Sequence, residues 1–337
     1  MLRIKMNIFN ENTYKRLSVI NKQKIPHVDI LLKYLHKLPP IEFIKPKYTK
    51  TNEPAPLKSL IDSRFARFDS ILNSVKALKT KCVIELDEHV ITLYGNNISN
   101  TYISHIASII SWWAKIKPQK YIVTFYLTNI KKRLPPLDAP RVLTEEYMNS
   151  GFTFVASPCD IHIFRREESL KVLIHELIHA CKIDFNGSHL VDVPVVLKDE
   201  DISNEGITEY LAIIHYYWYV ANFITKNIDP DEQFVELLSN DLGWQHYQIS
   251  KILKYFSLNP DDLFERNQFK QKTSVMSYFF LKNYLFSKPS LPIIMSRNLD
   301  NINKLILNMK EYVDNFGVEE VMDDAISMRM SLYELAY

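Results

Sequence analysis

Residues 171–184 read KVLIHELIHACKID, an apolar run that carries two histidines four residues apart and a glutamate beside the first. In an α-helix, which turns by ~100° per residue, His175 and His179 lie one turn apart on one face, with Glu176 next to them. Two imidazoles at this spacing can each direct a ring nitrogen at one metal ion, and the carboxylate can reach water bound to it. The pattern H-E-x-x-H therefore predicts a metal centre.

The rest of this run forms a second, apolar face with helical spacing, made of Leu170, Ile174, Leu177, Ile178 and Cys181. We expect this stripe to pack into a core within a helix of about 18 residues that stops at Asn186-Gly187. Another interpretation is that both histidines are core residues bonded to carbonyl groups, with Glu176 paired to Lys182 or Arg166. A metal ion would satisfy all three polar groups at once, so we favour the metal site.

A third ligand is required, because zinc in hydrolases usually takes three protein ligands and one water. The stretch DISNEGITEYLA, residues 201–212, places Glu205 and Glu209 one turn apart on a second predicted helix. We assign Glu205 as the third ligand and Glu209 as the acceptor for the spare N–H of a ligating histidine. Gly206 between them predicts a close approach to the zinc helix. The alternative is an acidic, solvated helix start.

These two stretches together resemble the gluzincin superfamily of zinc metallopeptidases, which includes thermolysin-like enzymes, zinc aminopeptidases and clostridial neurotoxin light chains. That pattern is H-E-x-x-H, a downstream Asn-Glu and an acidic residue four positions further on, and residues 204–209 read NEGITE. The resemblance implies that His175, His179 and Glu205 bind one Zn²⁺ per chain and that Glu176 is the general base. It places Glu209 at the last acidic position, and it is specific over residues 145–215.

Composition describes a globular protein of 337 residues, of which 47% are hydrophobic, with a net charge of +2. This balance favours neither nucleic acid nor an acidic membrane surface as a partner. No segment reaches 18 consecutive apolar residues, so we expect no membrane span. The expected partner is a peptide or protein substrate, and no oligomeric state is predicted.

Three scattered cysteines, Cys82, Cys159 and Cys181, argue against a disulfide framework and for a cytoplasmic or other reducing compartment. The first residues contain no apolar run of the length found in signal peptides. Lys, Asn, Ile and Tyr are abundant and Gly is scarce, a composition typical of AT-rich genomes such as those of large DNA viruses, protists and low-GC bacteria.

The hydrophobic patterns predict an α+β fold, and the resemblance implies that it is of zincin-like type. Residues 81–94 alternate like one or two strands, 101–116 form a helix, and 120–130 form a strand. Residues 149–164 predict a hairpin with strands at 152–156 and 161–164 joined by a turn at Ser157-Pro158. A small mixed sheet with an edge hairpin would thus lead directly into the zinc helix.

Three segments follow from these patterns. Residues 1–55 are punctuated by prolines and predict an arm or lid, 56–219 predict the α+β half with both site helices, and 220–337 are helical to the end. A metal centre between an α+β half and a helical half is also what the resemblance implies.

The expected function is zinc-dependent hydrolysis of a peptide bond, with Glu176 taking a proton from metal-bound water. The oxyanion needs a further donor; we prefer Tyr278, and the other candidates are His215, His246 and Tyr247. A core tyrosine is the ordinary alternative for Tyr278. A substrate strand that pairs with the hairpin edge at 152–156 favours an endopeptidase.

Two further classes of protein stay open. One is a catalytically silent structural or virion assembly protein that keeps a zincin scaffold. An intact Glu176 argues against it, because a structural zinc site has no use for a base. The other is a toxin-like protease directed at one host protein, since cleavage specificity lies in loops that the sequence does not define.

Overall fold

The computed structural model describes residues 17, 20–136, 138–154, 159–185, 200–224, 228–264, 269–321 and 327–335. The described residues within 37–132 and 145–183 form one compact unit, and the remaining ones form a second. We call them the α+β unit and the helical unit, and each is described separately. The architecture is α+β with a mixed sheet, as the sequence patterns predicted, and the sheet has six strands.

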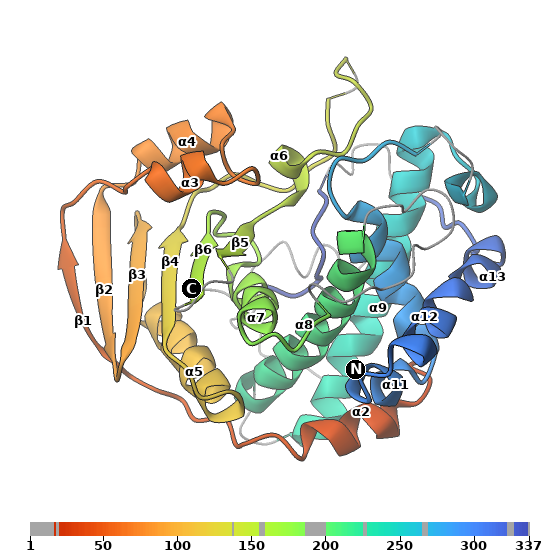
Figure 1. Ribbon diagram of the computed structural model, residues 1–337, viewed down its shortest axis with the longest axis horizontal. Coiled ribbons are helices and arrows are strands. Elements are labelled where there is room, and N and C mark those ends of the chain that lie inside the picture. The colour runs from red at the N-terminus through yellow and green to blue at the C-terminus, as the bar shows by residue number, and fades with distance from the viewer. Residues whose placement is uncertain are drawn as a thin grey trace. The chain divides into compact units, whose positions relative to one another are not determined.

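The α+β unit is built on one sheet with the strand order β1-β2-β3-β4-β6-β5 (Figure 1). Its strands are β1 (Lys47–Thr51), β2 (Thr80–Leu86), β3 (His89–Gly95), β4 (Tyr121–Tyr126), β5 (Gly151–Phe154) and β6 (Cys159–Ile163). The pairs β3-β4 and β4-β6 are parallel, and the others are antiparallel. The sequence patterns did not predict β1, because KYTKT lies almost wholly exposed at the sheet edge and has no alternating apolar pattern.

The predicted hairpin is confirmed. β5 pairs antiparallel with β6, from Gly151 opposite Ile163 to Phe154 opposite Asp160. The predicted turn at Ser157-Pro158 lies outside the described residues. β5 is the last strand in the order, so one side of its backbone has no strand partner among the described residues.

Helices cover both faces of this sheet. Along β4, side chains alternate between the faces: Phe125 contacts Tyr102 of α5 (Asn100–Ile116), whereas Tyr126 stacks on Tyr94. The second face is buried with apolar residues from α3 (Lys58–Asp62) and α4 (Asp69–Lys76). The helix that carries the H-E-x-x-H motif, α7 (Ser169–Ala180), packs against α5, β5 and β6. A short helix, α6 (Glu145–Met148), precedes β5.

The helix α7 has 12 residues, fewer than predicted, because the residues before it make tertiary contacts instead of a first helical turn. Glu168 has a left-handed φ of 59°, and its carboxylate lies 3.0 Å from Lys132 Nζ. The Lys132 backbone N–H donates to the Glu167 carboxylate at 2.8 Å. These two acidic residues, which precede the helix, thus bind one buried lysine.

The other end of α7 is closed by a Schellman motif. Lys182 has a left-handed φ of 53°, its N–H donates to His179 O at 3.0 Å, and the Ile183 N–H donates to Ile178 O at 3.1 Å. The helix therefore stops just past the second histidine. The predicted stop at Asn186-Gly187 lies outside the described residues.

The helical unit is organised around two long helices, α8 (Glu200–Ile224) and α9 (Pro230–Phe256), which pack against each other (Figure 1). α8 runs without a break across the boundary predicted after residue 219. The other helices are α2 (Val28–Leu35), η1 (Pro260–Phe264), η2 (Ser277–Leu281), α10 (Lys282–Ser287), α11 (Ser290–Met295), α12 (Leu299–Leu307) and α13 (Met309–Asp314). η2 is a π-helical turn, a form that often occurs at functional sites.

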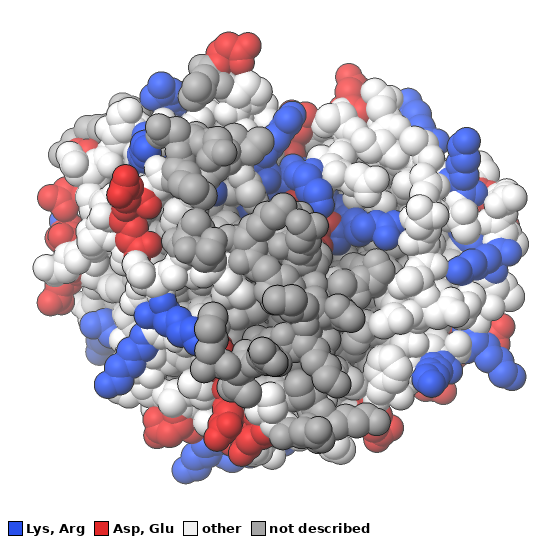
Figure 2. All heavy atoms as spheres, turned by 180° about the vertical axis from the view of Figure 1, so that it is seen from behind, with Lys and Arg blue, Asp and Glu red and all other residues white. Residues whose placement is uncertain are grey.

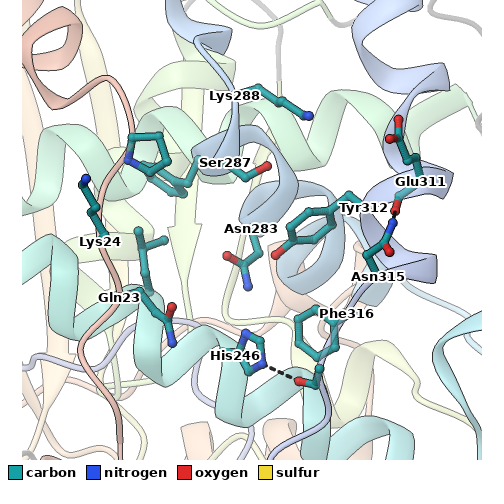
Figure 3. Close-up of a pocket in the computed structure, with 14 residues that line it drawn as sticks. Gln23, Lys24, His246, Asn283, Ser287, Lys288, Glu311, Tyr312, Asn315 and Phe316 are labelled. Carbon is teal, nitrogen blue, oxygen red and sulfur yellow. Dashed lines mark hydrogen bonds between the residues drawn. The ribbon is translucent and has the colours of Figure 1, made fainter.

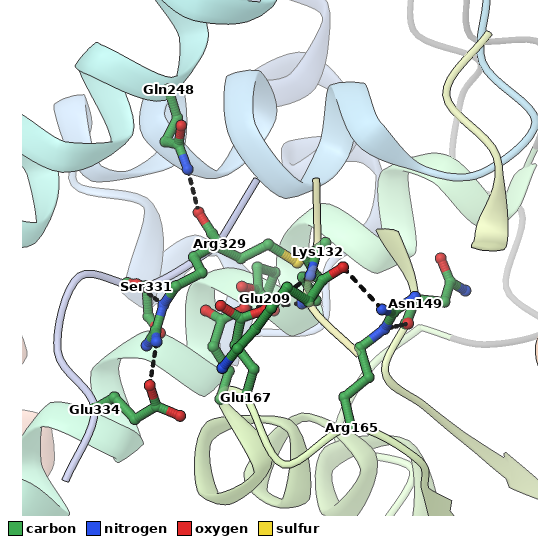
Figure 4. A network of polar contacts seen from close by, with 12 residues as sticks. Lys132, Asn149, Arg165, Glu167, Glu209, Gln248, Arg329, Ser331 and Glu334 are labelled. Atoms are coloured by element: carbon green, nitrogen blue, oxygen red, sulfur yellow. Dashed lines mark hydrogen bonds and ion pairs between the residues drawn. The ribbon is translucent and has the colours of Figure 1, made fainter. Parts of the chain in front are cut away.

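The prediction of helix to the end of the chain is wrong for residues 327–335, which are irregular and mostly buried. One face of α9 holds them: Asp241 accepts the Leu332 N–H at 2.7 Å, and the Gln248 amide donates to Arg329 O at 2.8 Å (Figure 4). Polar residues of α9 replace the hydrogen bonds that a helix would have provided. The sequence pattern of α9 does not predict these contacts, because polar residues such as Asp241 and Gln248 on a helix are typical of a face exposed to solvent.

None of the helices in the described ranges combines the length and apolar character needed to cross a membrane. The cysteines Cys82, Cys159 and Cys181 are free and buried. Among the described residues on the face drawn in Figure 2, acidic and basic side chains are interspersed, in keeping with the small net charge.

Candidate metal centre

The two motif histidines face each other on α7. Their Nε2 atoms are 3.1 Å apart, and their ring centroids are separated by 4.9 Å with an angle of 72° between the planes. Both side chains are buried, at 7% and 9% exposure. Two Zn–N bonds of ~2.0–2.1 Å at a tetrahedral angle would separate the nitrogens by ~3.3 Å. The observed spacing is close to that separation, so the pair fits two corners of a tetrahedral site.

The apolar stripe of α7 behaves as predicted and explains why the histidines are fixed. All five of its members are buried: Leu170, Ile174, Leu177, Ile178 and Cys181. This face anchors the helix to the sheet and to α5. Burial of this kind fixes the helix, and the rotation of α7 then determines where the opposite face points.

Glu176 is held by the edge strand. The Thr153 hydroxyl donates to Glu176 Oε2 at 2.7 Å, and a Cβ on Gly151 would lie only 2.9 Å from Oε1. Gly151 thus leaves room for the carboxylate, and Thr153 orients it. The sequence patterns predicted a role for neither residue. They left Arg166 as a possible partner of Glu176, but Arg166 donates to Asn96 O at 2.6 Å.

Glu205 lies on α8 in the helical unit, where it is partly buried. The Tyr278 hydroxyl from η2 donates to Glu205 Oε2 at 3.2 Å. Tyr278 was the preferred candidate for a donor, and the structure places it on the predicted metal ligand. Its role during a reaction remains a prediction.

Glu209, one turn further along α8, lies 3.4 Å from the Nζ atom of Lys282. Both side chains are inaccessible to solvent, and Lys282 also donates to Met330 O at 2.8 Å. Sequence reasoning missed Lys282. The available signal was a lysine four residues after Tyr278 in the apolar run SYFFLKNYLF. The role predicted for Glu209, as acceptor of a histidine N–H, stays a prediction.

Another segment does pack closely against Gly206, but that segment is not the predicted one. A Cβ at Gly206 would lie 2.5 Å from Leu281 Cδ2, and the next nearest atoms also belong to Leu281. Gly206 therefore lets η2 pack tightly on α8, whereas the sequence analysis expected the zinc helix there.

The three other donor candidates have structural partners in the helical unit. The ring nitrogens of His215 contact Leu211 O at 2.7 Å and the Tyr34 hydroxyl at 3.0 Å. His246 Nε2 donates to Gly317 O at 2.5 Å. Tyr247 is buried and stacked on Trp244. Tyr278 is the candidate whose hydroxyl contacts a predicted ligand.

Taken together, His175, His179 and Glu205 form a group of three residues that could hold a metal ion, each offering one ligand atom. Two imidazole nitrogens and one carboxylate oxygen are a donor set suited to zinc. Comparisons with protein-family models, with curated proteins and with solved structures each gave no match.

Proposed function

We propose that this protein is a zinc metallopeptidase of the gluzincin type. The observation that carries the proposal is the geometry of α7: two buried imidazoles with Nε2 atoms 3.1 Å apart, next to a carboxylate that Thr153 fixes. A structural zinc site needs no carboxylate beside it, whereas hydrolysis needs a base at that point. The mixed sheet with an antiparallel edge strand beside this helix supports a zincin-like fold.

The proposed ligands are His175 and His179, both neutral, and the carboxylate of Glu205. Zinc bound by them would polarise a carbonyl group and lower the pKa of a bound water towards ~7. A buried pair of neutral imidazoles supplies two lone pairs at the right separation, and the carboxylate supplies a compensating negative charge. Zinc is proposed as the metal because the donor set consists of two imidazole nitrogens and one carboxylate oxygen.

Glu176 would accept the proton of the attacking water and then pass it to the leaving amine. Thr153 donates to Oε2 and so leaves Oε1, beside Gly151, as the oxygen available for the proton. A carboxylate held by one hydrogen bond loses little orientational entropy when it acts as a base. Tyr278 would donate its hydroxyl proton as a hydrogen bond to the developing oxyanion.

The substrate would add a strand to the edge of the sheet at β5. This edge carries unpaired backbone groups among the described residues, and Phe154 at its end is 40% exposed. Because an internal stretch of peptide can pair with such an edge, we propose an endopeptidase. Glu176 and the substrate backbone would then contact the same short strand, the first through the Thr153 side chain and the second through the edge of β5.

The test is turnover of an unfolded protein substrate by the zinc-loaded enzyme, with Glu176→Gln as the key variant. The amide cannot take up a proton, so turnover should fall by ~10²–10⁴-fold while zinc content and Tm stay near those of the parent. Glu88→Gln, which removes an exposed carboxylate elsewhere in the α+β unit, is the matched control. A chelator should abolish turnover, and His175→Ala should lose the metal.

A zincin scaffold without activity predicts a different result. In that case the parent cleaves no peptide under any metal loading, and Glu176→Gln matters only for stability. This outcome would reject the peptidase proposal in favour of a structural or assembly protein.

A further inference from the structure

A pocket of about 380 Å³ lies within the helical unit, in a region that the proposed metal centre does not use (Figure 3). It is lined by residues of α9, α10 and α13, by the segment around Lys24 that precedes α2, and by Phe316 and Gly317. Its volume lies within the range of ~300–1,000 Å³ typical of small-molecule sites.

The floor of the pocket carries an unsatisfied polar group. Asn283 on α10 is 7% exposed, and its amide Nδ2 has no hydrogen-bond partner among the described residues. A buried donor left unpaired costs about 1–3 kcal/mol, so such groups usually serve a ligand or an ordered water. Figure 3 shows the Tyr312 hydroxyl directed towards Asn283, and burial raises the pKa of this hydroxyl, which keeps it a donor.

One wall of the pocket is flat and aromatic. His246 stacks on Phe316 with ring centroids 4.0 Å apart and an angle of 20° between the planes. The hydrogen bond from His246 Nε2 to Gly317 O fixes this pair. With the proton on Nε2, the Nδ1 atom of this ring is an acceptor. A planar ligand ring can stack beside such a wall, and Phe286 adds a further aromatic surface.

The rim of the pocket is cationic. Lys24 and Lys288 are exposed at the pocket, and neither ammonium group has an ion-pair partner in the described part of the chain. Glu311 also lies at the rim, so the balance is two positive charges against one negative charge. A metal cation is disfavoured by the two ammonium groups, and an uncharged ligand would leave them unused.

We propose that this pocket binds a small organic anion that carries a flat ring. The ring would lie against His246 and Phe316, a polar atom of the ligand would accept from Asn283, and a carboxylate or phosphate would reach Lys24 and Lys288. A ligand of this class would bond the Asn283 amide, stack on the aromatic pair and pair with the two ammonium groups. The inference goes beyond the peptidase proposal and does not depend on it.

The experiment is calorimetric titration of the full chain with four probes: adenosine 5′-monophosphate, 4-hydroxybenzoate, adenosine and inorganic phosphate. One of the two ring-bearing anions should bind with a Kd below about 1 mM, and adenosine and phosphate should bind at least about tenfold more weakly. Which anion binds distinguishes a phosphate ligand from a carboxylate ligand. A Glu176→Gln protein should give the same result, which separates this test from that of the peptidase.

Two variants locate the binding. Asn283→Leu removes the unpaired amide with little change of volume, so it should weaken binding by about tenfold without lowering Tm. Lys24→Gln with Lys288→Gln should weaken binding and reduce its dependence on salt, whereas Lys304→Gln, an exposed lysine of α12 away from the pocket, should not.

The proposal is overturned if neither ring-bearing anion binds at millimolar concentration. It is also overturned if binding is unchanged in Asn283→Leu and in the double lysine variant, since the ligand would then lie elsewhere. Loss of Tm in Asn283→Leu would mean that the amide has a structural partner, most simply an ordered water, and would equally contradict the assignment.

Discussion

The Tyr278 hydroxyl donates a hydrogen bond of 3.2 Å to Oε2 of Glu205. Four residues further along both elements, Lys282 lies 3.4 Å from Glu209. Two polar contacts thus connect α8 to the π-helical turn and α10, one helical turn apart. Gly206 makes this spacing achievable, because any larger side chain there would meet Leu281.

We predict that Tyr278→Phe lowers turnover by ~10²-fold, the effect expected for loss of one oxyanion donor. Zinc content should not change, because Glu205 keeps both carboxylate oxygens. Steady-state kinetics with metal analysis of the same preparation provide the measurement. Unchanged turnover would assign Tyr278 a purely structural role.

Glu205→Gln should reduce zinc affinity more than Glu209→Gln does. The first change would remove the proposed charged ligand, whereas the second would remove the proposed orienting group, whose loss typically costs 10–100-fold in affinity. Competition titration against a zinc-binding dye measures both constants. A reversed order would mean that the two glutamates have exchanged roles.

Lys282→Met should destabilise the helical unit by about 3–5 kcal/mol, because the buried carboxylate of Glu209 loses its compensating charge. The double variant Lys282→Met with Glu209→Gln should recover part of this loss, since the charge of Glu209 is removed together with that of its partner. Chemical denaturation of the parent, both single variants and the double variant gives the coupling energy. Additive effects of the two substitutions would exclude a functional ion pair.

Stability should fall as pH falls from about 6.5 towards 4, in part through His215. Burial lowers the pKa of His215 to about 4, and its Nδ1–H donates to Leu211 O while Nε2 accepts from Tyr34, whose pKa burial raises to about 12. His215 is therefore protonated at about pH 6.5 in the unfolded state, but only at about pH 4 in the folded state.

Once His215 is protonated in the unfolded state and still neutral in the folded state, the free energy of unfolding should be lower by on the order of 3 kcal/mol. His215→Asn, which can keep the bond to Leu211 O, should flatten the dependence of Tm on pH in that window. His105, whose pKa burial also lowers to about 4, should still contribute. Equal pH slopes for the parent and His215→Asn would contradict the assignment.

The sequence by itself determined the local chemistry of α7 and the strands that lead to it. Helical spacing alone brings His175 and His179 together and puts Glu176 beside them, and alternation alone identifies the β5-β6 hairpin, because both depend on neighbours within a few residues. The sequence also indicated Glu205 and Tyr278 as candidate site residues, but the hydrogen bond between them is visible only in the tertiary structure.

Only the tertiary structure shows which residues from distant segments contact these acidic side chains. The contacts of Thr153 with Glu176, of Lys282 with Glu209 and of Lys132 with Glu168 each join residues far apart in the chain. Periodicity carries no information about such pairs. The same holds for β1, whose backbone pairs with β2, and for residues 327–335, where the Leu332 N–H donates to Asp241 of α9.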